Sequence, residues 1–149
     1  MGDCTAEIVP GADVSVICAD VDGTVLASDL LYESFLHVIK KHPSTIFRIP
    51  FWLCRGRAYL KARLAEKAGS LNVASLPLHD NVVSYLKEQA SQGKKIVLAS
   101  ASHTNLVAKV AQRLGFVSSI VASSDSFNCK GARKAEAIRS HLGDVRWEY

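Results

Sequence analysis

The chain has 149 residues, of which 48% are hydrophobic, so it can bury the core of one domain and is too apolar to be disordered. Its 18 Lys and Arg residues outnumber its 14 Asp and Glu residues, which gives a net charge of +4. That excess suits an anionic partner such as a phosphorylated compound, and a solvated surface explains it equally well. Because no basic and aromatic motif accompanies the charge, we expect no specific binding to nucleic acid.

The cysteines and the N-terminus predict a cytoplasmic protein. None of the four cysteines belongs to a Cys-x-x-Cys pair, so we expect reduced, mainly structural thiols. The segment Met1-Gly2-Asp3-Cys4 lacks the basic and apolar regions of a signal peptide. No stretch reaches the ~18 uncharged apolar residues of a membrane span. The apolar run 46–53 is too short, and Arg48 interrupts it.

Apolar runs alternate with amphipathic segments along the chain. Strands are predicted at residues 14–19, 95–99, 119–122 and, as the start of a fourth, 145–149. Helices are predicted at residues 29–41, 79–92, 103–114 and 130–142. Strands that are apolar on both faces are typical of a parallel sheet covered by helices on each side. The sequence therefore predicts an α/β fold, a Rossmann-like doubly wound parallel sheet.

Residues 29–76 carry no strand signal and predict a helical insert after the first strand. Asp29 is expected to cap its first helix, Pro43 to end that helix, and Gly56 to separate two further helices. We interpret the insert as a small helical cap over the carboxyl end of the first strand. The predicted division is an N-terminal tail at 1–13, a core domain at 14–28 and 77–149, and the cap at 29–76.

Two carboxylates, Asp20 and Asp22, lie two residues apart where the first strand breaks into a turn. One carboxylate can attack a phosphorus or carbon centre, while the other delivers a proton to the leaving group. The same pair, together with a backbone carbonyl, can hold a hard cation such as Mg²⁺. A turn without function would also favour Asp and Gly. A calcium-binding loop is excluded, because its pattern requires Gly at Val25 and Glu at Leu31.

Further polar residues follow the other strands. In an open parallel sheet, ligands bind beyond the carboxyl ends of the strands, so Asp20 and Ser100 are expected to point into one crevice. The segment Ser100-Ala101-Ser102 leads into a helix that Ser102 is expected to cap, and the first N–H groups of this helix suit a phosphate oxygen. Lys130 and Lys134 open the next helix, where a lysine would neutralise the nucleophile and the phosphoryl charge. His103 either contacts a substrate or lies on the surface, and the histidines show no zinc-ligand spacing.

These motifs resemble those of the haloacid dehalogenase superfamily of aspartyl-phosphate hydrolases. Asp20-Val21-Asp22-Gly23-Thr24 matches its first motif, Asp-x-Asp-Gly-Thr, and Ile96-Val97-Leu98-Ala99-Ser100 matches its second, an apolar strand ending in Ser or Thr. Lys134 fits the lysine of the third motif best because a predicted helix follows it, and Lys130 is the competing candidate.

The resemblance implies a Mg²⁺-dependent phosphohydrolase or phosphotransferase. Asp20 would attack the phosphorus, and Asp22 would protonate the leaving oxygen and then activate water. The implied metal ligands are Asp20 and Asp22. The implied substrate-binding residues are Gly23, Thr24, Ser100, Ala101, Ser102, Lys130 and Lys134.

Further segments are similar to the soluble phosphatase-like domains fused ahead of bacterial membrane prenyltransferases of the UbiA type. They are Asp29-Leu30-Leu31-Tyr32-Glu33-Ser34, Arg55-Gly56-Arg57-Ala58-Tyr59-Leu60-Lys61, Leu76-Pro77 and Asn128-Cys129-Lys130-Gly131. This similarity implies a small or lipid-linked phosphate ester as substrate, and association with a prenyltransferase or with the inner face of the membrane. The basic segment 48–67, with Phe51, Trp52 and Tyr59, would suit an anionic membrane surface, although solvated charges on a cap helix explain it too.

The chain departs from the superfamily at its fourth motif, an acidic segment after the next strand that completes the Mg²⁺ site. The sequence stops at Trp147-Glu148-Tyr149, where that strand would deliver it, so we expect a domain fragment. Asp144 is at the wrong end of the predicted strand, and Glu148 is a weak substitute. The alternative to an active enzyme is a regulatory domain that binds a phosphorylated ligand without turnover.

Overall fold

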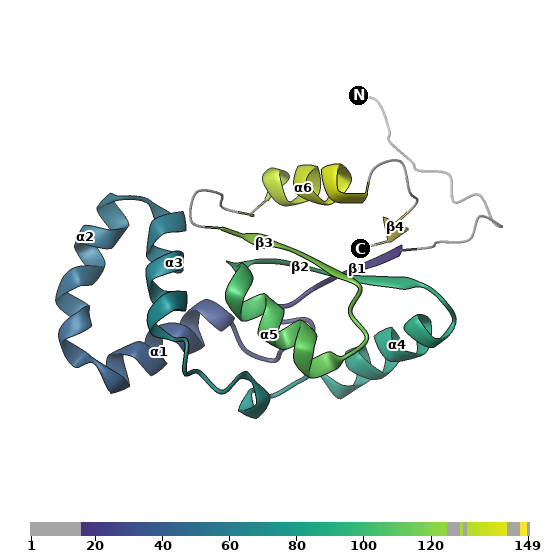
Figure 1. The fold of residues 1–149 in the computed structure, drawn as a ribbon, viewed down its shortest axis with the longest axis horizontal. Coiled ribbons are helices and arrows are strands. Elements are labelled where there is room, and N and C mark those ends of the chain that lie inside the picture. The colour runs from purple at the N-terminus through teal and green to yellow at the C-terminus, as the bar shows by residue number, and fades with distance from the viewer. Residues whose placement is uncertain (1–15, 125–128, 130, 143–146, 149) are drawn as a thin grey trace, which may run out of the picture.

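The computed structural model of the protein describes residues 16–124, 129, 131–142 and 147–148. Within these residues, four parallel strands form one sheet in the order β3-β2-β1-β4, which confirms the predicted α/β fold (Figure 1). The strands are β1 (Val16–Asp20), β2 (Lys95–His103), β3 (Ser119–Ser123) and β4 (Trp147–Glu148). The helices that flank the sheet are α4 (Asp80–Ser91), α5 (Thr104–Leu114) and α6 (Ala132–Leu142).

The side chains of β1 alternate between two hydrophobic clusters, one on each face of the sheet. Ile17 and Ala19 belong to the larger cluster, to which α4 and α5 contribute. Val16 and Cys18 belong to the smaller cluster, to which α6 contributes. Because successive residues of a strand point to opposite faces, the continuous apolar run of β1 buries both faces. Figure 1 shows the resulting layers, with α6 on one side of the sheet and α4 and α5 on the other.

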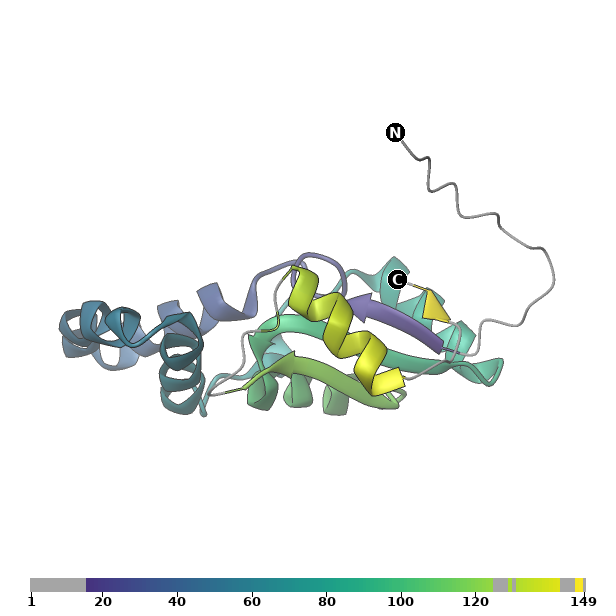
Figure 2. The same ribbon diagram turned by 90° about the horizontal axis from the view of Figure 1, so that it is seen from above.

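The helical insert stands at the end of the sheet toward which β1 points (Figure 2). It has a hydrophobic cluster of its own, centred on the buried residues Val38, Trp52, Leu64 and Ala68. Its first helix is capped as predicted, because the Asp29 carboxylate accepts a hydrogen bond from the Tyr32 N–H at 3.0 Å. Its elements are α1 (Leu30–Lys41), η1 (Pro43–Arg48), α2 (Ile49–Cys54), α3 (Arg57–Lys67) and η2 (Val73–Ser75).

The two segments that join the insert to the sheet run side by side. The Ala27 N–H donates to the Pro77 carbonyl at 3.0 Å, and the His79 N–H donates to the Val25 carbonyl at 3.0 Å. The root of the insert also packs against the main core, where Leu30 is fully buried. The insert is therefore tied to the core at both of its ends. None of the helices in the described part of the chain is long and apolar enough to cross a bilayer.

The end of β2 differs from the prediction. The strand was expected to stop at Ala99, but it continues to His103, because its end pairs with β3 again after a shift of register. The helix that follows begins at Thr104, and its cap is His103 rather than Ser102. The ring Nδ1 of His103 accepts the Asn105 N–H at 3.3 Å. Ser102 does not cap the helix, because it lies inside β2 and its hydroxyl donates to Asp22 Oδ2.

Candidate active site

The two predicted carboxylates lie where β1 ends in a tight turn. Asp20 is the last residue of the strand, and the turn that carries Asp22 is closed by a 2.8 Å hydrogen bond from the Leu26 N–H to the Val21 carbonyl. Both of these apolar residues are fully buried, so they anchor the turn to the core. Gly23 has a φ of +75°, a conformation that other residues adopt at a cost. The glycine of the motif is therefore required by the shape of the turn.

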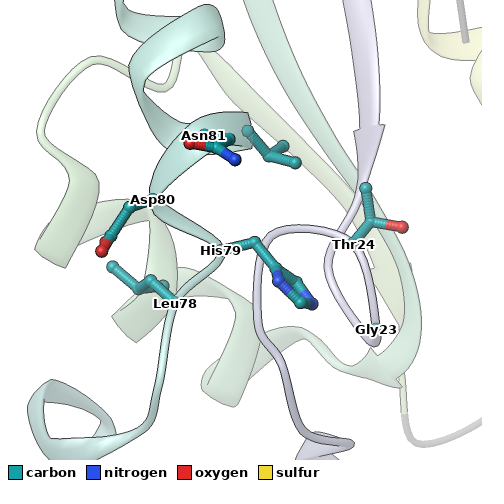
Figure 3. A pocket seen from close by; sticks show the side chains of 7 residues that line it. Gly23, Thr24, Leu78, His79, Asp80 and Asn81 are labelled. Carbon is teal, nitrogen blue, oxygen red and sulfur yellow. The ribbon is translucent and has the colours of Figure 1, made fainter.

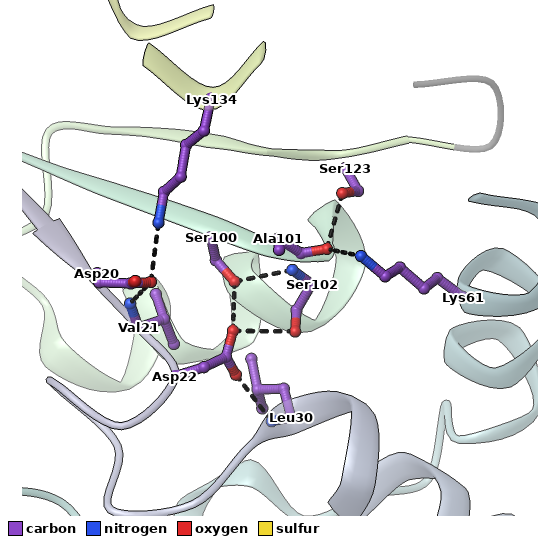
Figure 4. A network of polar contacts seen from close by, with 10 residues as sticks. All are labelled: Asp20, Val21, Asp22, Leu30, Lys61, Ser100, Ala101, Ser102, Ser123 and Lys134. Atoms are coloured by element: carbon purple, nitrogen blue, oxygen red, sulfur yellow. Dashed lines mark hydrogen bonds and ion pairs between the residues drawn. The ribbon is translucent and has the colours of Figure 1, made fainter. Parts of the chain in front are cut away.

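Lys134, in the first turns of α6, reaches across the edge of the sheet to Asp20. Its Nζ lies 3.0 Å from Asp20 Oδ1, and its side chain is largely buried. The same carboxylate oxygen accepts the Val21 N–H at 2.8 Å. Figure 4 shows this lysine approaching the carboxylate from α6. Of the two lysines that the sequence leaves open, Lys134 is the one placed at Asp20, while Lys130 lies outside the described residues.

Three donors hold the Asp22 carboxylate in one orientation. Its Oδ1 accepts the Leu30 N–H at 2.8 Å, and its Oδ2 accepts the hydroxyls of Ser100 at 2.7 Å and Ser102 at 3.1 Å. Ser100 is fully buried, and its Oγ also accepts the Ser102 N–H at 2.9 Å. In this structure both serines position Asp22, so their contact with a phosphate stays a prediction (Figure 4).

Lys61 is a second lysine at the site, and it belongs to the basic segment 48–67, which the sequence assigns either to an anionic membrane surface or to solvated charges. It comes from α3 of the insert, is only 9% exposed, and donates from Nζ to the Ala101 carbonyl at 2.6 Å. The Ser123 hydroxyl, at the end of β3, donates to the same carbonyl at 2.7 Å. Helical spacing carried a signal for this burial, because Lys61 lies four and seven residues before the buried Ala65 and Ala68.

Cys129 lies close enough to Lys134 and Lys61 for the charges of both lysines to act on its thiol. It is fully buried, and its N–H donates to Ser123 Oγ at 2.9 Å. Burial raises the pKa of the Cys129 thiol, while the charges of Lys134 and Lys61 lower it in part and Asp20 raises it. Burial also raises the pKa of Cys18 to about 11. Burial therefore favours the neutral form of both thiols, and the structural role expected for the cysteines stays a prediction.

Gly23 and Thr24 lie on a different side of the turn. Together with the start of α4 they line a cavity of about 570 Å³, to which neither Asp20 nor Asp22 contributes (Figure 3). The His79 side chain points from the other wall toward the loop that carries Gly23. Thr24 also lines a second cavity, of about 400 Å³, and this one includes Asp20. The predicted substrate contacts of Gly23 and Thr24 thus stay predictions.

Oxygen ligands for a cation at this site come from few residues. Across the described residues no group of three or more His, Cys, Asp and Glu side chains could hold a metal ion. Glu148 lines the cavity beside Asp20, but it pairs with Ile17, three residues or roughly 10 Å back along β1. Asp144 lies outside the described part. Mg²⁺ commonly takes one or two carboxylates plus waters and substrate oxygens, and the Asp20 carboxylate is a ligand of this kind.

Comparison with known proteins identifies the relatives of the chain. A family model described as haloacid dehalogenase-like hydrolase matches residues 48–149. The uncharacterized protein y4nM of Sinorhizobium fredii is 31% identical over 125 residues, which cover 83% of this chain and 24% of that protein. The chain thus spans about a quarter of the length of this curated relative.

Solved structures share the fold. A protein of unknown function from Bordetella pertussis aligns with a TM-score of 0.61 and 17% identity, over 89% of this chain and 75% of that one. A HAD family hydrolase from Salmonella enterica serovar Typhi aligns with a TM-score of 0.54 and 14% identity, over 85% of this chain and 50% of that one. A phosphoserine phosphohydrolase-like protein from Francisella tularensis aligns with a TM-score of 0.53 and 17% identity, over 87% of this chain and 72% of that one. At these identities the likeness concerns the fold.

Proposed function

Since this chain belongs to the haloacid dehalogenase-like hydrolase family, we propose that it hydrolyses phosphate esters with Asp20 as the nucleophile. The observation that carries the proposal is the convergence of Asp20, Asp22 and Lys134 at one edge of the sheet, with Lys134 paired to Asp20 at 3.0 Å. Residues 29–76 act as the cap of this site, and Lys61 brings a second cation from it.

The two carboxylates divide the chemistry. An Asp20 oxygen attacks the phosphorus while the bond from phosphorus to the leaving oxygen breaks, and a protonated Asp22 gives its proton to that oxygen. Water then attacks the aspartyl phosphate and loses a proton to Asp22, which releases inorganic phosphate and restores both carboxyl groups. The hydrogen bonds from Leu30, Ser100 and Ser102 hold Asp22 in place for both transfers.

Charge compensation is the other requirement, because a carboxylate that attacks a phosphate dianion meets like charge. Lys134 and Lys61 supply positive charge on two sides of the crevice. The Asp20 carboxylate and the Asp22 main-chain carbonyl would hold Mg²⁺, which when bound neutralises charge on the phosphoryl oxygens. We propose a small or lipid-linked phosphate ester as the substrate.

The chain is related to one part of a longer protein. In the Sinorhizobium relative, about three-quarters of the chain lies outside the matched part. Together with the sequence similarity to domains fused to UbiA-type prenyltransferases, this supports a domain that works beside such an enzyme at the inner face of the membrane. A regulatory domain that binds a phosphorylated ligand without turnover is the second candidate. It is favoured by the full engagement of the Asp22 carboxylate with protein donors.

Hydrolysis of p-nitrophenyl phosphate tests the two candidates. We expect turnover with Mg²⁺, its loss with EDTA and its return when Mg²⁺ is added in excess. Adding glycerol and measuring p-nitrophenol and inorganic phosphate separately distinguishes hydrolysis from transfer, because transfer releases less phosphate than p-nitrophenol. Phosphate-ester binding by calorimetry without turnover would contradict the phosphohydrolase and favour the regulatory domain.

Replacing Lys61 by Met tests the role of the cap lysine. We expect kcat/KM for p-nitrophenyl phosphate to fall by about 10- to 100-fold, since a charged hydrogen bond at the crevice is lost. The matched control is Arg57→Met, which removes an exposed cation from the same helix and should leave kcat/KM unchanged. Equal activity of both variants, with unchanged thermal melting, would contradict a role for Lys61 at the site.

A further inference from the structure

We propose that the outer end of the helical insert is a membrane-binding surface that seats on a bilayer containing anionic phospholipid. We call this region the tip surface and define it by four exposed apolar side chains, Ile46, Phe47, Phe51 and Leu53. The proposal rests on the exposure and charge of the insert. It does not require turnover, so it stands independently of the phosphatase assignment.

The exposed apolar residues of the protein are concentrated on the insert. Phe47 is 85% exposed, Phe51 63%, Leu53 51% and Ile46 49%. Among the described residues, the other large apolar side chains exposed to this degree are Tyr32, also on the insert, and Tyr85. Exposed apolar side chains concentrated in one region in this way mark an interaction site with a protein or a membrane.

Helix α2 is apolar on every side, which is unusual for a helix at the surface. Its sequence is Ile-Pro-Phe-Trp-Leu-Cys, and only Trp52 is buried in the cluster of the insert. Phe51 and Leu53, on either side of it in sequence, face solvent. On this outer side the Arg55 guanidinium lies 5.7 Å from the centre of the Phe51 ring, so a cationic and an aromatic group are exposed side by side.

The charge of the insert selects an anionic partner. Residues 34–65 contain seven Lys and Arg residues and no Asp or Glu. The rest of the chain has 11 Lys and Arg residues against 14 Asp and Glu residues, so the positive charge of the protein belongs to this segment. Arg48, Arg55 and Arg57 are exposed and flank the apolar side chains in sequence. Basic residues beside exposed aromatic ones are the composition that binds the interface of an anionic bilayer.

The position of the tip surface suits contact with a flat partner. Figures 1 and 2 agree that η1 and α2 lie at the outer end of the insert, farthest from the sheet. A bilayer that meets this end touches none of β1, β2, β3 and α6, which carry the candidate active site. The structure also corrects the membrane-facing residues expected from the sequence, because Trp52 and Lys61 are buried. The surface is therefore centred on residues 46–57.

Flotation with lipid vesicles tests the proposal. We expect the protein to float with vesicles of equal parts phosphatidylcholine and phosphatidylglycerol, to remain unbound with phosphatidylcholine alone, and to dissociate at high salt. The double variant Phe47→Ser/Phe51→Ser should lower the bound-to-free ratio at least about tenfold, because it removes two aromatic anchors. Arg48→Glu/Arg57→Glu should lower it to a similar extent. The matched controls are Tyr85→Ser and Lys87→Glu, exposed substitutions of the same kinds on α4, which should float like the parent protein.

Three outcomes would overturn the membrane surface. The first is no flotation with anionic vesicles, and the second is equal flotation of the Phe47→Ser/Phe51→Ser variant, which would show attraction by charge alone. The third is a parent protein that is dimeric by light scattering and a tip variant that is monomeric, without vesicle binding, which would assign the patch to a second copy. Because all substituted side chains are exposed, thermal melting should match that of the parent chain.

Discussion

Replacing Asp20 by Asn is expected to lower kcat for p-nitrophenyl phosphate by at least about a thousandfold. The substitution keeps the size of the side chain but removes the attacking carboxylate. It also removes the charge that lies 3.0 Å from the Nζ of Lys134. Steady-state kinetics with Mg²⁺ present gives the measurement, and circular dichroism of both proteins confirms that the fold is retained. Residual turnover within about tenfold of the parent protein would exclude Asp20 as nucleophile.

Asp22→Asn separates nucleophilic attack from the acid and base steps. The leaving group p-nitrophenol needs little protonation, so the variant should still form the aspartyl phosphate and release a burst of about one equivalent of p-nitrophenol. Hydrolysis should then be slow, because no base activates the water. Mass spectrometry after acid quench should find one added phosphoryl group, on the peptide that contains Asp20. An Asp22→Asn variant with full steady-state turnover would contradict the proposed division of roles.

The position of the two carboxylates at the end of β1 could be predicted because the relevant information is local. A strand that is apolar on both faces and ends in a turn places Asp20 and Asp22 at the carboxyl end of the sheet, where ligands bind. The choice of Lys134 over Lys130 comes from the resemblance to the third motif, and the structure places Lys134 3.0 Å from Asp20. The position of the carboxylates depends on periodicity and topology, which a single sequence carries.

The remaining contacts depend on tertiary structure. Ser102 was expected to cap a helix, but the second pairing of β2 with β3 keeps it within the strand, where its hydroxyl reaches Asp22. Helical spacing indicates that Lys61 can be buried, but it does not reveal that the Ala101 carbonyl lies beside α3 to accept its hydrogen bond. Likewise, the all-apolar sequence of α2 cannot indicate that Trp52 packs inward and Phe51 outward. Each of these outcomes is decided by how the insert packs on itself and against the sheet.

Replacing Lys134 by Met is expected to lower kcat/KM for p-nitrophenyl phosphate by about a hundredfold, while the fold is preserved. The Nζ of the lysine lies 3.0 Å from the proposed nucleophile, and the lysine side chain is largely buried. Methionine retains most of the apolar length of the side chain, so the change tests charge rather than packing. Lys134→Arg should recover only part of the activity, because a planar guanidinium does not reproduce a point charge in a space fitted to an ammonium.

Two neighbouring substitutions decide whether this lysine carries the role that the third motif implies. Arg133→Met removes an exposed cation next to it on α6 and should leave kcat/KM unchanged. Lys130→Met removes the competing candidate of the sequence analysis, and we expect a much smaller loss than for Lys134→Met. The reverse order, with the larger loss at Lys130, would assign the third motif to Lys130. The ion pair between Lys134 and Asp20 would then be structural, and Lys130 would compensate the charge on the phosphoryl group instead.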